Sequence, residues 1–257
     1  MKIVTWNVNS IRARLARVVE WLASERPHVA LLQELKCVGE AFPHDAIGEL
    51  GYNALVCGQK TYNGVAILSL SPIDELARAL PGEDTDEEAR YLEAFTAGVR
   101  VASVYVPQGQ AVGTERFAYK LRFLDRLAAQ ARAMLASEEA FVIGGDLNVA
   151  PNAGDVFDAE ALDGEVCFHP DERARFCRLM NLGLIDALAA LHPEAGHFSY
   201  WDYRAGAWTK DQGLRIDHLL LSPQAADRLG ASGVDRRPRG LEGCSDHAPV
   251  WCELDIG

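Results

Sequence analysis

Five apolar segments of this 257-residue chain run directly into, or directly follow, acidic, amide or histidine side chains. Each such residue alone has a plain alternative, since turn caps and ion pairs also place polar groups at element ends. Several buried carboxylates together are costly unless they are paired or bind metal. Oxygen donors with one imidazole suit a hard divalent cation such as Mg²⁺ or Mn²⁺. The residues concerned are Asn7, Glu34, Asp146, Asn148, Asp217, Asp246 and His247.

Two local patterns sharpen this prediction. Gly144-Gly145 precedes Asp146, and we expect the two glycines to allow a tight turn and to leave room for a substrate. His247 follows Asp246, and Asp217 lies elsewhere in the chain. A carboxylate beside His247 would fix its tautomer and keep it protonated next to an anionic substrate. The pattern alone leaves open which aspartate is the partner.

The elements that position these residues alternate between strands and helices. Apolar periodicity predicts a helix over residues 10–24, a second from the Thr114 N-cap to about residue 135, and a third from Pro170 to near Gly183. The polar stretch 81–90 is expected to be an exposed loop. This order favours an α/β fold with two packed sheets or one large sheet. Strands are predicted at residues 3–8, 29–32, 64–69, 99–106, 141–143, 216–221 and 248–254.

Composition narrows the class further. Apolar residues make up 49% and charged residues 24%, which is ordinary for a globular protein and predicts one domain over residues 1–257. No apolar run is long enough to cross a membrane, and the N-terminus lacks the pattern of a signal peptide. The six cysteines include no CxxC pair, so we expect reduced thiols, no zinc cluster and a cytoplasmic location. The net charge of −12 disfavours a uniformly basic surface but allows a local basic rim.

Six motifs occur in order along the chain: NVNSIRA (7–13), LQELK (32–36), YVPQG (105–109), GGDLNVAP (144–151), GLRID (213–217) and SDHAPV (245–250). Together they resemble the exonuclease III family of abasic-site DNA repair enzymes, a branch of the endonuclease/exonuclease/phosphatase superfamily. The resemblance runs from residue 3 to residue 252 and is to the compact bacterial form. It departs at Ser10, where many relatives have glycine, and at Tyr200, where tryptophan or phenylalanine is usual.

The resemblance implies a four-layer αββα sandwich of two mixed β-sheets flanked by helices, as in DNase I. It also implies hydrolysis of phosphodiester bonds with Mg²⁺ or Mn²⁺, using one or two ions. Abasic duplex DNA would be incised 5′ to the lesion, 3′ blocking groups would be removed, and 3′→5′ exonuclease activity is expected. The implied partner is double-stranded DNA with abasic sites or blocked 3′ ends. The protein is expected to be a monomer and not to associate with a membrane.

By residue, the resemblance assigns a role to each candidate. Glu34 is the principal metal ligand with Asn7 beside it, and Asp246 belongs to a second metal site. Asp146 orients and deprotonates the attacking water. The metal-binding set implied is Asn7, Glu34, Asp146, Asn148, Asp246 and His247. The catalytic set is Tyr105, which contacts the phosphate or leaving oxygen, Asp146, Asn148, which holds the water or phosphate, Asp217, the partner of His247, and His247, which binds phosphate.

Residues for binding DNA are implied in the same way. An apolar pocket for a base-less deoxyribose would select its substrate by excluding a base, because an extruded abasic sugar has little stacking to lose. Basic and polar side chains would contact phosphates. Without the flanking motifs, the pocket residues would read as ordinary core, and the basic ones as surface. The implied DNA-binding set is Arg12, Lys36, Gln108, Tyr200, Trp201, Leu214 and Ile216.

The sequence is also compatible with two functions other than DNA repair. One is a non-catalytic relative that binds RNA or protein, and the other is a phosphohydrolase that acts on a phospholipid or an inositol phosphate. The complete set of candidate ligands disfavours the first. The segment around Arg12, the motif that begins at Tyr105 and the region of Trp201 favour DNA over the second.

Overall fold

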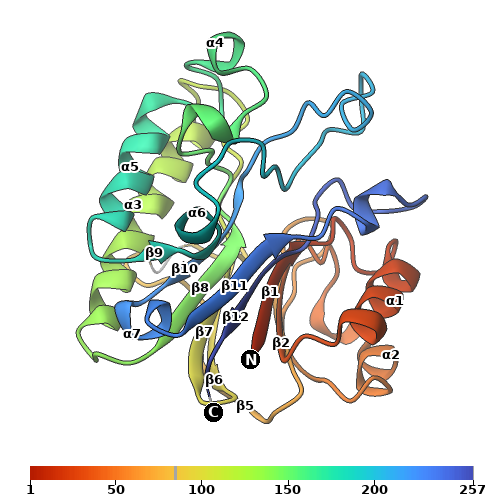
Figure 1. Cartoon of the computed structure of the whole chain (residues 1–257). Coiled ribbons are helices and arrows are strands. Elements are labelled where there is room, and N and C mark those ends of the chain that lie inside the picture. The colour runs from red at the N-terminus through yellow and green to blue at the C-terminus, as the bar shows by residue number, and fades with distance from the viewer. Residues whose placement is uncertain (84–85, 257) are drawn as a thin grey trace.

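The computed structural model, which describes residues 1–83 and 86–256, contains two six-stranded mixed sheets packed face to face (Figure 1). Within the sheets, β1 pairs in parallel with β2 and β7 with β8, and the other pairs are antiparallel. The first sheet has the order β11 (Leu229–Val234), β12 (Val250–Leu254), β1 (Lys2–Asn7), β2 (Val29–Gln33), β4 (Val65–Ser69), β3 (Asn53–Cys57). The second has the order β5 (Ile73–Ala77), β6 (Tyr91–Thr96), β7 (Val99–Tyr105), β8 (Phe141–Asp146), β10 (Asp217–Leu221), β9 (Ile185–Asp186).

Helices cover both outer faces, so the predicted four-layer αββα sandwich is confirmed. α1 (Leu15–Glu25) and α2 (His44–Gly48) lie on the first sheet, and α3 (Glu115–Leu135) and α5 (Pro170–Met180) on the second (Figure 1). Shorter elements complete the connections: α4 (Ala159–Leu162), α6 (Ala187–Leu191), α7 (Pro223–Ala226), and the 3₁₀ turns Gly39–Ala41, Ala153–Asp155 and Pro238–Gly240.

Three apolar layers hold the sandwich together. The layer between the sheets includes Ile3 and Leu31 from one sheet and Val101, Val142 and Leu219 from the other, all fully buried. The two outer layers lie between each sheet and its helices. Burial of apolar area on both faces of each sheet explains why the central strands read as nearly continuous apolar runs.

Helix starts follow local chemistry. The Thr114 side chain accepts a hydrogen bond from the Phe117 N–H at 3.2 Å, which confirms Thr114 as the N-cap of α3. Pro170 opens α5 as predicted. The first helix differs, because α1 begins at Leu15 and not at Ser10. Ser10 has a positive φ of 83°, a conformation that a helix does not use, and residues 11–14 form a turn.

The prediction for Gly144 and Gly145 was wrong. Both lie inside β8, and neither forms a turn. A Cβ at Gly145 would lie 1.9 Å from the Val104 carbonyl oxygen, and one at Gly144 would lie 2.5 Å from the Leu31 side chain. The glycines therefore allow close packing of β8 against β7 and the facing sheet. The space that their missing side chains leave is filled by other protein atoms and is not open to a substrate.

The predicted loop over residues 81–90 connects β5 to β6, although residues 84 and 85 lie outside the described part of the chain. Arg90, at its end, is buried and donates to Glu88 and to the Tyr105 carbonyl. Across residues 1–83 and 86–256, no helix has both the length and the apolar character that a bilayer crossing needs.

Candidate active site

The register of the strands brings three candidate residues to one end of the second sheet. Asp146 is the last residue of β8, and it pairs with Tyr105 on β7 and with Asp217 on β10. In the first sheet, Asn7 ends β1 and Glu34 directly follows β2. The two sheets therefore deliver these side chains to the same rim of the sandwich.

One amide joins two carboxylates at this rim. The Asn7 Nδ2 atom donates to Glu34 Oε1 at 2.8 Å and to Asp146 Oδ2 at 2.9 Å, while the Asn7 Oδ1 atom accepts from the Asn9 N–H. Asn7 was predicted to be a metal ligand, but its nitrogen faces the carboxylates and its oxygen is engaged elsewhere. In this structure Asn7 orients the two acids.

Glu34 is held from three sides. Its Oε1 accepts a 2.9 Å hydrogen bond from the Tyr105 hydroxyl, and its Oε2 lies 2.7 Å from the Lys36 ammonium. Burial alone would raise the pKa of Glu34, but Lys36 and the Asn7 amide outweigh it and hold the pKa below its ordinary value. Glu34 also has a positive φ of 52°, an uncommon conformation that turns the chain at the end of β2.

Asp217 is the partner of His247, as the resemblance implied and the residue pattern alone left open. The Asp217 Oδ2 atom lies 2.8 Å from His247 Nδ1, and His247 Nε2 lies 3.8 Å from Asp146 Oδ2. Burial opposes protonation of the imidazole, but the charges of Asp217 and Asp146 outweigh it and raise the pKa of His247 to about 10. An imidazolium therefore persists here through the neutral range.

Asp146 lies in the opposite electrostatic situation. Burial raises the pKa of Asp146 to about 7, and the negative charges of Asp217 and Glu34 add to the rise. His247 and the Asn7 amide oppose it. Burial and the Glu34 and Asp146 charges likewise raise the pKa of the Tyr105 phenol well above its ordinary value. Tyr105 is thus a proton donor at neutral pH. A cation placed beside Asp146 would stabilise its ionised carboxylate.

The donor set fits a divalent cation. Asp146 and Asp217 place carboxylate oxygens within 4.8 Å of each other and of a ring nitrogen of His247, and the buried Asp217 Oδ1 has no hydrogen-bond partner among the described residues. His247 was also predicted to be a metal ligand, but as an imidazolium it has no lone pair for an ion, so the carboxylates are the donors. Glu34 and Asp146 share one amide proton donor, so their like charges lie close together. Carboxylates in this arrangement favour a hard ion with oxygen ligands.

Asp246 lies on another wall of the same cavity. Its Oδ1 accepts from Asn9 Nδ2 at 2.9 Å, and the Asn9 Oδ1 in turn accepts from Lys36 Nζ at 2.5 Å. Asn9 therefore links the Asp246 and Glu34 sides of the site. Lys36, predicted to contact DNA, has its ammonium occupied by Glu34 and Asn9.

A cavity of about 710 Å³ opens over these groups. One part of its wall is polar and includes Glu34, Asp146 and His247. The other part is apolar, and Tyr200 joins the two because its ring centroid lies 4.9 Å from that of His247. The apolar wall consists of Phe157, Leu162, Val166, Cys167, Leu214 and Ile216.

Most predicted site residues meet at this cavity, but three DNA-binding candidates, Arg12, Lys36 and Trp201, do not line it. Trp201 is fully buried, packs edge-on against Trp208 at 4.9 Å, and donates from Nε1 to Asp211, so the expectation that it lines the pocket was wrong. Arg12 is exposed and lies outside the cavity wall. Gln108 is exposed and does line the cavity.

Asn148 follows Asp146 with a positive φ of 51°. Its N–H donates to Asp146 Oδ1 at 3.0 Å, and its Nδ2 donates to the Val106 carbonyl at 3.0 Å. The Asn148 side chain is thereby fixed beside the carboxylate, and it lines the cavity.

Sequence reasoning missed several residues of the site. Ser199 Oγ donates to Asp217 Oδ2 at 2.6 Å and accepts from the Asp217 N–H, so it orients the partner of His247. Phe157, Leu162 and Val166 come from the short helix α4 and the segments on either side of it, and an apolar excess between residues 156 and 168 was the only available signal.

A buried ion pair between two helices fixes the backbone of two loops of the site. Lys120 on α3 and Glu172 on α5 are both fully buried, with Nζ and Oε1 2.5 Å apart. The Lys120 ammonium also donates to the carbonyls of Asn148 at 2.7 Å and Gln108 at 3.2 Å. The helix layer therefore fixes the backbone beside Asp146.

Comparison with known proteins agrees with this architecture. The chain is 33% identical to exodeoxyribonuclease III of Haemophilus influenzae, with 99% of this chain and 100% of the relative covered. An AP endonuclease structure from Archaeoglobus fulgidus has 36% identity and a TM-score of 0.95, and the 3′ phosphatase NExo from Neisseria, bound to product DNA hairpin, has 39% and 0.97, both covering 100% of each chain. The Endonuclease/Exonuclease/phosphatase family matches residues 4–247. The chain belongs to this family.

Proposed function

We propose that this protein is a DNA repair nuclease that hydrolyses phosphodiester bonds 5′ to abasic sites in duplex DNA and at blocked or normal 3′ ends. The observation that carries the proposal is that one cavity brings together two carboxylates bound to the same amide, a buried histidine paired with Asp217, and an apolar wall. The names of the similar proteins support both kinds of substrate. We also propose that the protein acts as a monomer in the cytoplasm, as expected from its sequence.

Mg²⁺ is the proposed cofactor, and Mn²⁺ suits the same donors. Glu34 and Asp146 would hold the ion, and Asp246 would belong to the site of a second one. Asn7, in the orientation described, supports the ligands. When bound, the cation neutralises the phosphate oxygens and makes the phosphorus easier to attack.

The protein side chains divide the remaining work. Asp146 is proposed to orient a water in line with the phosphate and to take its proton, with Asn148 fixing the position of the carboxylate. His247, kept as imidazolium by Asp217, would bind a phosphate oxygen and stabilise the charge that develops there. Tyr105, a proton donor at neutral pH, would assist departure of the leaving oxygen.

The apolar wall is proposed to select the substrate. Leu214, Val166 and Phe157 can pack against a bare deoxyribose, but an attached base would need the volume that they fill. An abasic nucleotide also has little stacking to lose when it is extruded. Both effects favour an abasic site over a normal 3′ nucleotide. Trp201 does not contact the substrate in this proposal, because it is fully buried and does not line the cavity.

Replacing Val166 and Leu214 together with alanine should open this wall and reduce the preference for an abasic site over a normal 3′ nucleotide. Methylene-sized changes in an apolar pocket alter discrimination by about 10–200-fold, so the ratio of kcat/KM for an internal abasic analogue to that for a recessed 3′ end should fall by about tenfold or more. Leu241→Ala, at an exposed leucine away from the cavity, is the control. An unchanged ratio in the double variant would show that the wall does not set specificity.

Glu34→Gln should weaken the dependence on metal while the fold is retained. A neutral amide keeps the shape and the bond to Tyr105 as an acceptor but loses the charge that attracts a cation. The Mg²⁺ concentration for half-maximal activity should rise by at least about tenfold. Glu40→Gln, at an exposed acid, should leave it unchanged. Wild-type activity of Glu34→Gln at limiting Mg²⁺ would remove Glu34 from the ligand set.

A further inference from the structure

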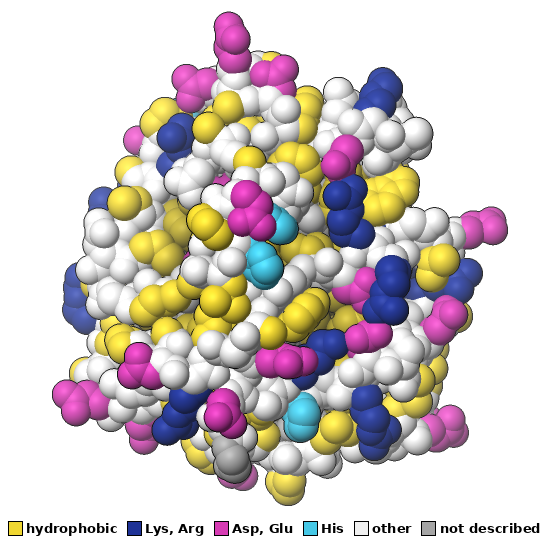
Figure 2. Space-filling model, in the orientation of Figure 1, with side chains coloured by type: hydrophobic (Ala, Val, Ile, Leu, Met, Phe, Trp, Pro, Cys, Tyr) yellow, Lys and Arg dark blue, Asp and Glu magenta, His cyan; other side chains and the backbone are white. Residues whose placement is uncertain are grey.

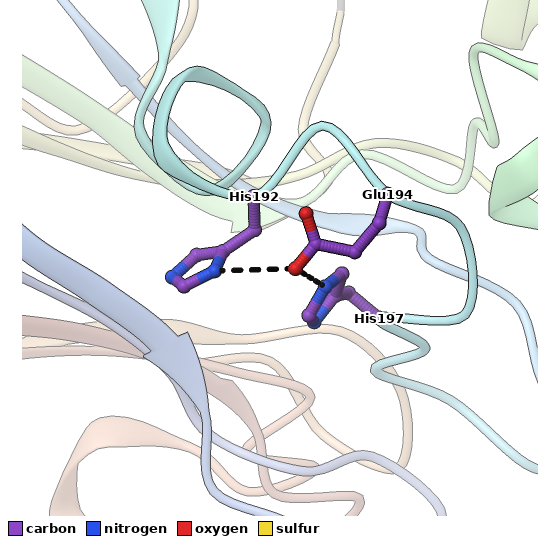
Figure 3. A group of neighbouring side chains, drawn as sticks. All are labelled: His192, Glu194 and His197. Atoms are coloured by element: carbon purple, nitrogen blue, oxygen red, sulfur yellow. Dashed lines mark hydrogen bonds and ion pairs between the residues drawn. The ribbon is translucent and has the colours of Figure 1, made fainter.

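A second group of metal-binding side chains lies on the loop after α6, outside the cavity described above. His192, Glu194 and His197 place one ligand atom each within 4.8 Å of one another. Figure 3 shows the two imidazoles turned toward the same carboxylate oxygen, Glu194 Oε1. The His192 Nδ1 atom lies 3.6 Å from that oxygen and the His197 Nε2 atom 3.0 Å.

The tautomer of His192 is fixed from outside the group. Its Nε2 lies 2.9 Å from the Ser232 carbonyl on β11, which can only accept, so this nitrogen carries a proton. In the neutral ring the Nδ1 lone pair then faces the Glu194 carboxylate. Two lone-pair donors turned toward each other need a cation between them, either a proton or a metal ion. A ring N–H bonded to a backbone carbonyl is also how metal-ligating histidines are usually oriented.

The loop that carries the group is held in place. His192 caps α6 through a 2.9 Å bond from its N–H to the Leu188 carbonyl. The Gly196 N–H donates to the Gly154 carbonyl at 3.1 Å, and Gly154 lacks a Cβ that would otherwise lie 2.9 Å from the Ala195 Cβ. The three ligands are therefore set on a loop tied at both ends, which lowers the entropic cost of binding.

The spacing and chemistry fit a borderline divalent ion. Ligands at 2.0–2.1 Å from a tetrahedral ion are about 3.3 Å apart, and the two distances to Glu194 Oε1 lie on either side of this value. Two imidazoles with one carboxylate suit Zn²⁺ better than Mg²⁺. The side chains are 35%, 61% and 31% exposed, so water can complete the coordination. Figure 2, which draws one face of the molecule, shows two neighbouring histidine side chains next to an acidic one near the centre of the view.

We propose that His192, Glu194 and His197 form a second metal site that takes a Zn²⁺-type ion and stabilises the loop leading into the active site. The site borders a small cavity of about 170 Å³ that Asp155 and Arg215 also line. Two residues beyond His197, Ser199 holds Asp217 by a 2.6 Å hydrogen bond. An ion bound only by the folded loop raises stability by mass action.

Zinc binding by the full-length protein in saturating Mg²⁺ tests the proposal, because Mg²⁺ occupies the oxygen-rich catalytic site. Equilibrium dialysis should find one more bound Zn²⁺ per chain in wild type than in His197→Ala, or at least about a tenfold weaker affinity in the variant. His44→Ala is the matched control, since His44 is exposed, its ring nitrogen lies 3.2 Å from the Gly39 carbonyl, and its ring packs edge-on against Phe42. Equal zinc binding by wild type and His197→Ala would overturn the proposal.

Thermal unfolding provides the second measurement. Each protein is compared with itself with and without Zn²⁺, so a small intrinsic effect of the substitution cancels. Zinc should raise the Tm of wild type and His44→Ala more than that of His197→Ala. An equal rise in all three would place the zinc elsewhere. No rise in any of them would mean that the three side chains form only a surface ion pair.

Discussion

Asp146→Asn should reduce DNA hydrolysis by orders of magnitude and leave DNA binding intact. The variant keeps the shape of the side chain and its acceptor for the Asn148 N–H, but an amide cannot take a proton from water. General base catalysis alone contributes about 10²–10⁴-fold, and loss of a proposed metal ligand adds to that. Removal of a negative charge beside phosphate does not weaken attraction, so Kd for an abasic duplex should stay the same or fall.

Single-turnover rates and DNA affinity measured on the same preparation check this prediction. Asp74→Asn is the matched control, because Asp74 is an exposed aspartate on β5. It should turn over like wild type. Near-normal turnover by Asp146→Asn would exclude Asp146 as the base.

Asp217→Asn should reduce kcat by about 10²–10³-fold, the usual loss when one preorganised charge-stabilising contact is removed. The Asp217 carboxylate makes the largest contribution to raising the pKa of His247, and burial opposes it. In wild type the imidazolium is present below about pH 10 and is lost as pH rises through that value. Without Asp217, burial dominates, and the alkaline limb of the pH–rate profile should move to lower pH.

A double-variant comparison separates this positioning role from a structural one. If Asp217 acts through His247, Asp217→Asn should cost little further activity once His247 has been replaced by glutamine. Additive losses, or an alkaline limb that stays in place in the single variant, would contradict the proposed role. The free energy of unfolding of each variant shows whether the fold is intact.

Much of the fold could be predicted from the sequence because the central strands are buried on both faces. Strands β1, β2, β4, β7, β8, β10 and β12 were predicted within a few residues of their bounds. The missed strands lacked that signal. β5 (Ile73–Ala77) is an exposed edge strand, and β11 (Leu229–Val234) carries two glycines. β6 contains Glu93, a buried acid whose pairing with Arg100 no local pattern reveals.

The polar half of the site was predictable because its residues sit at strand ends within ordered motifs. Pairings between distant segments were not, since only the register of β8 and β10 brings Asp217 to Asp146. Ser199 gave no signal because a lone serine is usually a surface or turn residue. Trp201 shows a different limit of prediction from sequence. An aromatic residue next to a site gives the same sequence pattern whether its side chain lines the cavity or, as here, is fully buried away from it.

The most direct test of the account is cleavage of a duplex that carries one abasic-site analogue, with Mg²⁺ and with the metal chelated, followed by mapping of both product ends. We predict a single incision 5′ to the lesion in Mg²⁺, with a 3′ hydroxyl on the upstream product. Chelation should abolish the incision, and so should Asp146→Asn in Mg²⁺. Incision that persists without metal, or an intact duplex after incubation with wild type in Mg²⁺, would contradict the account.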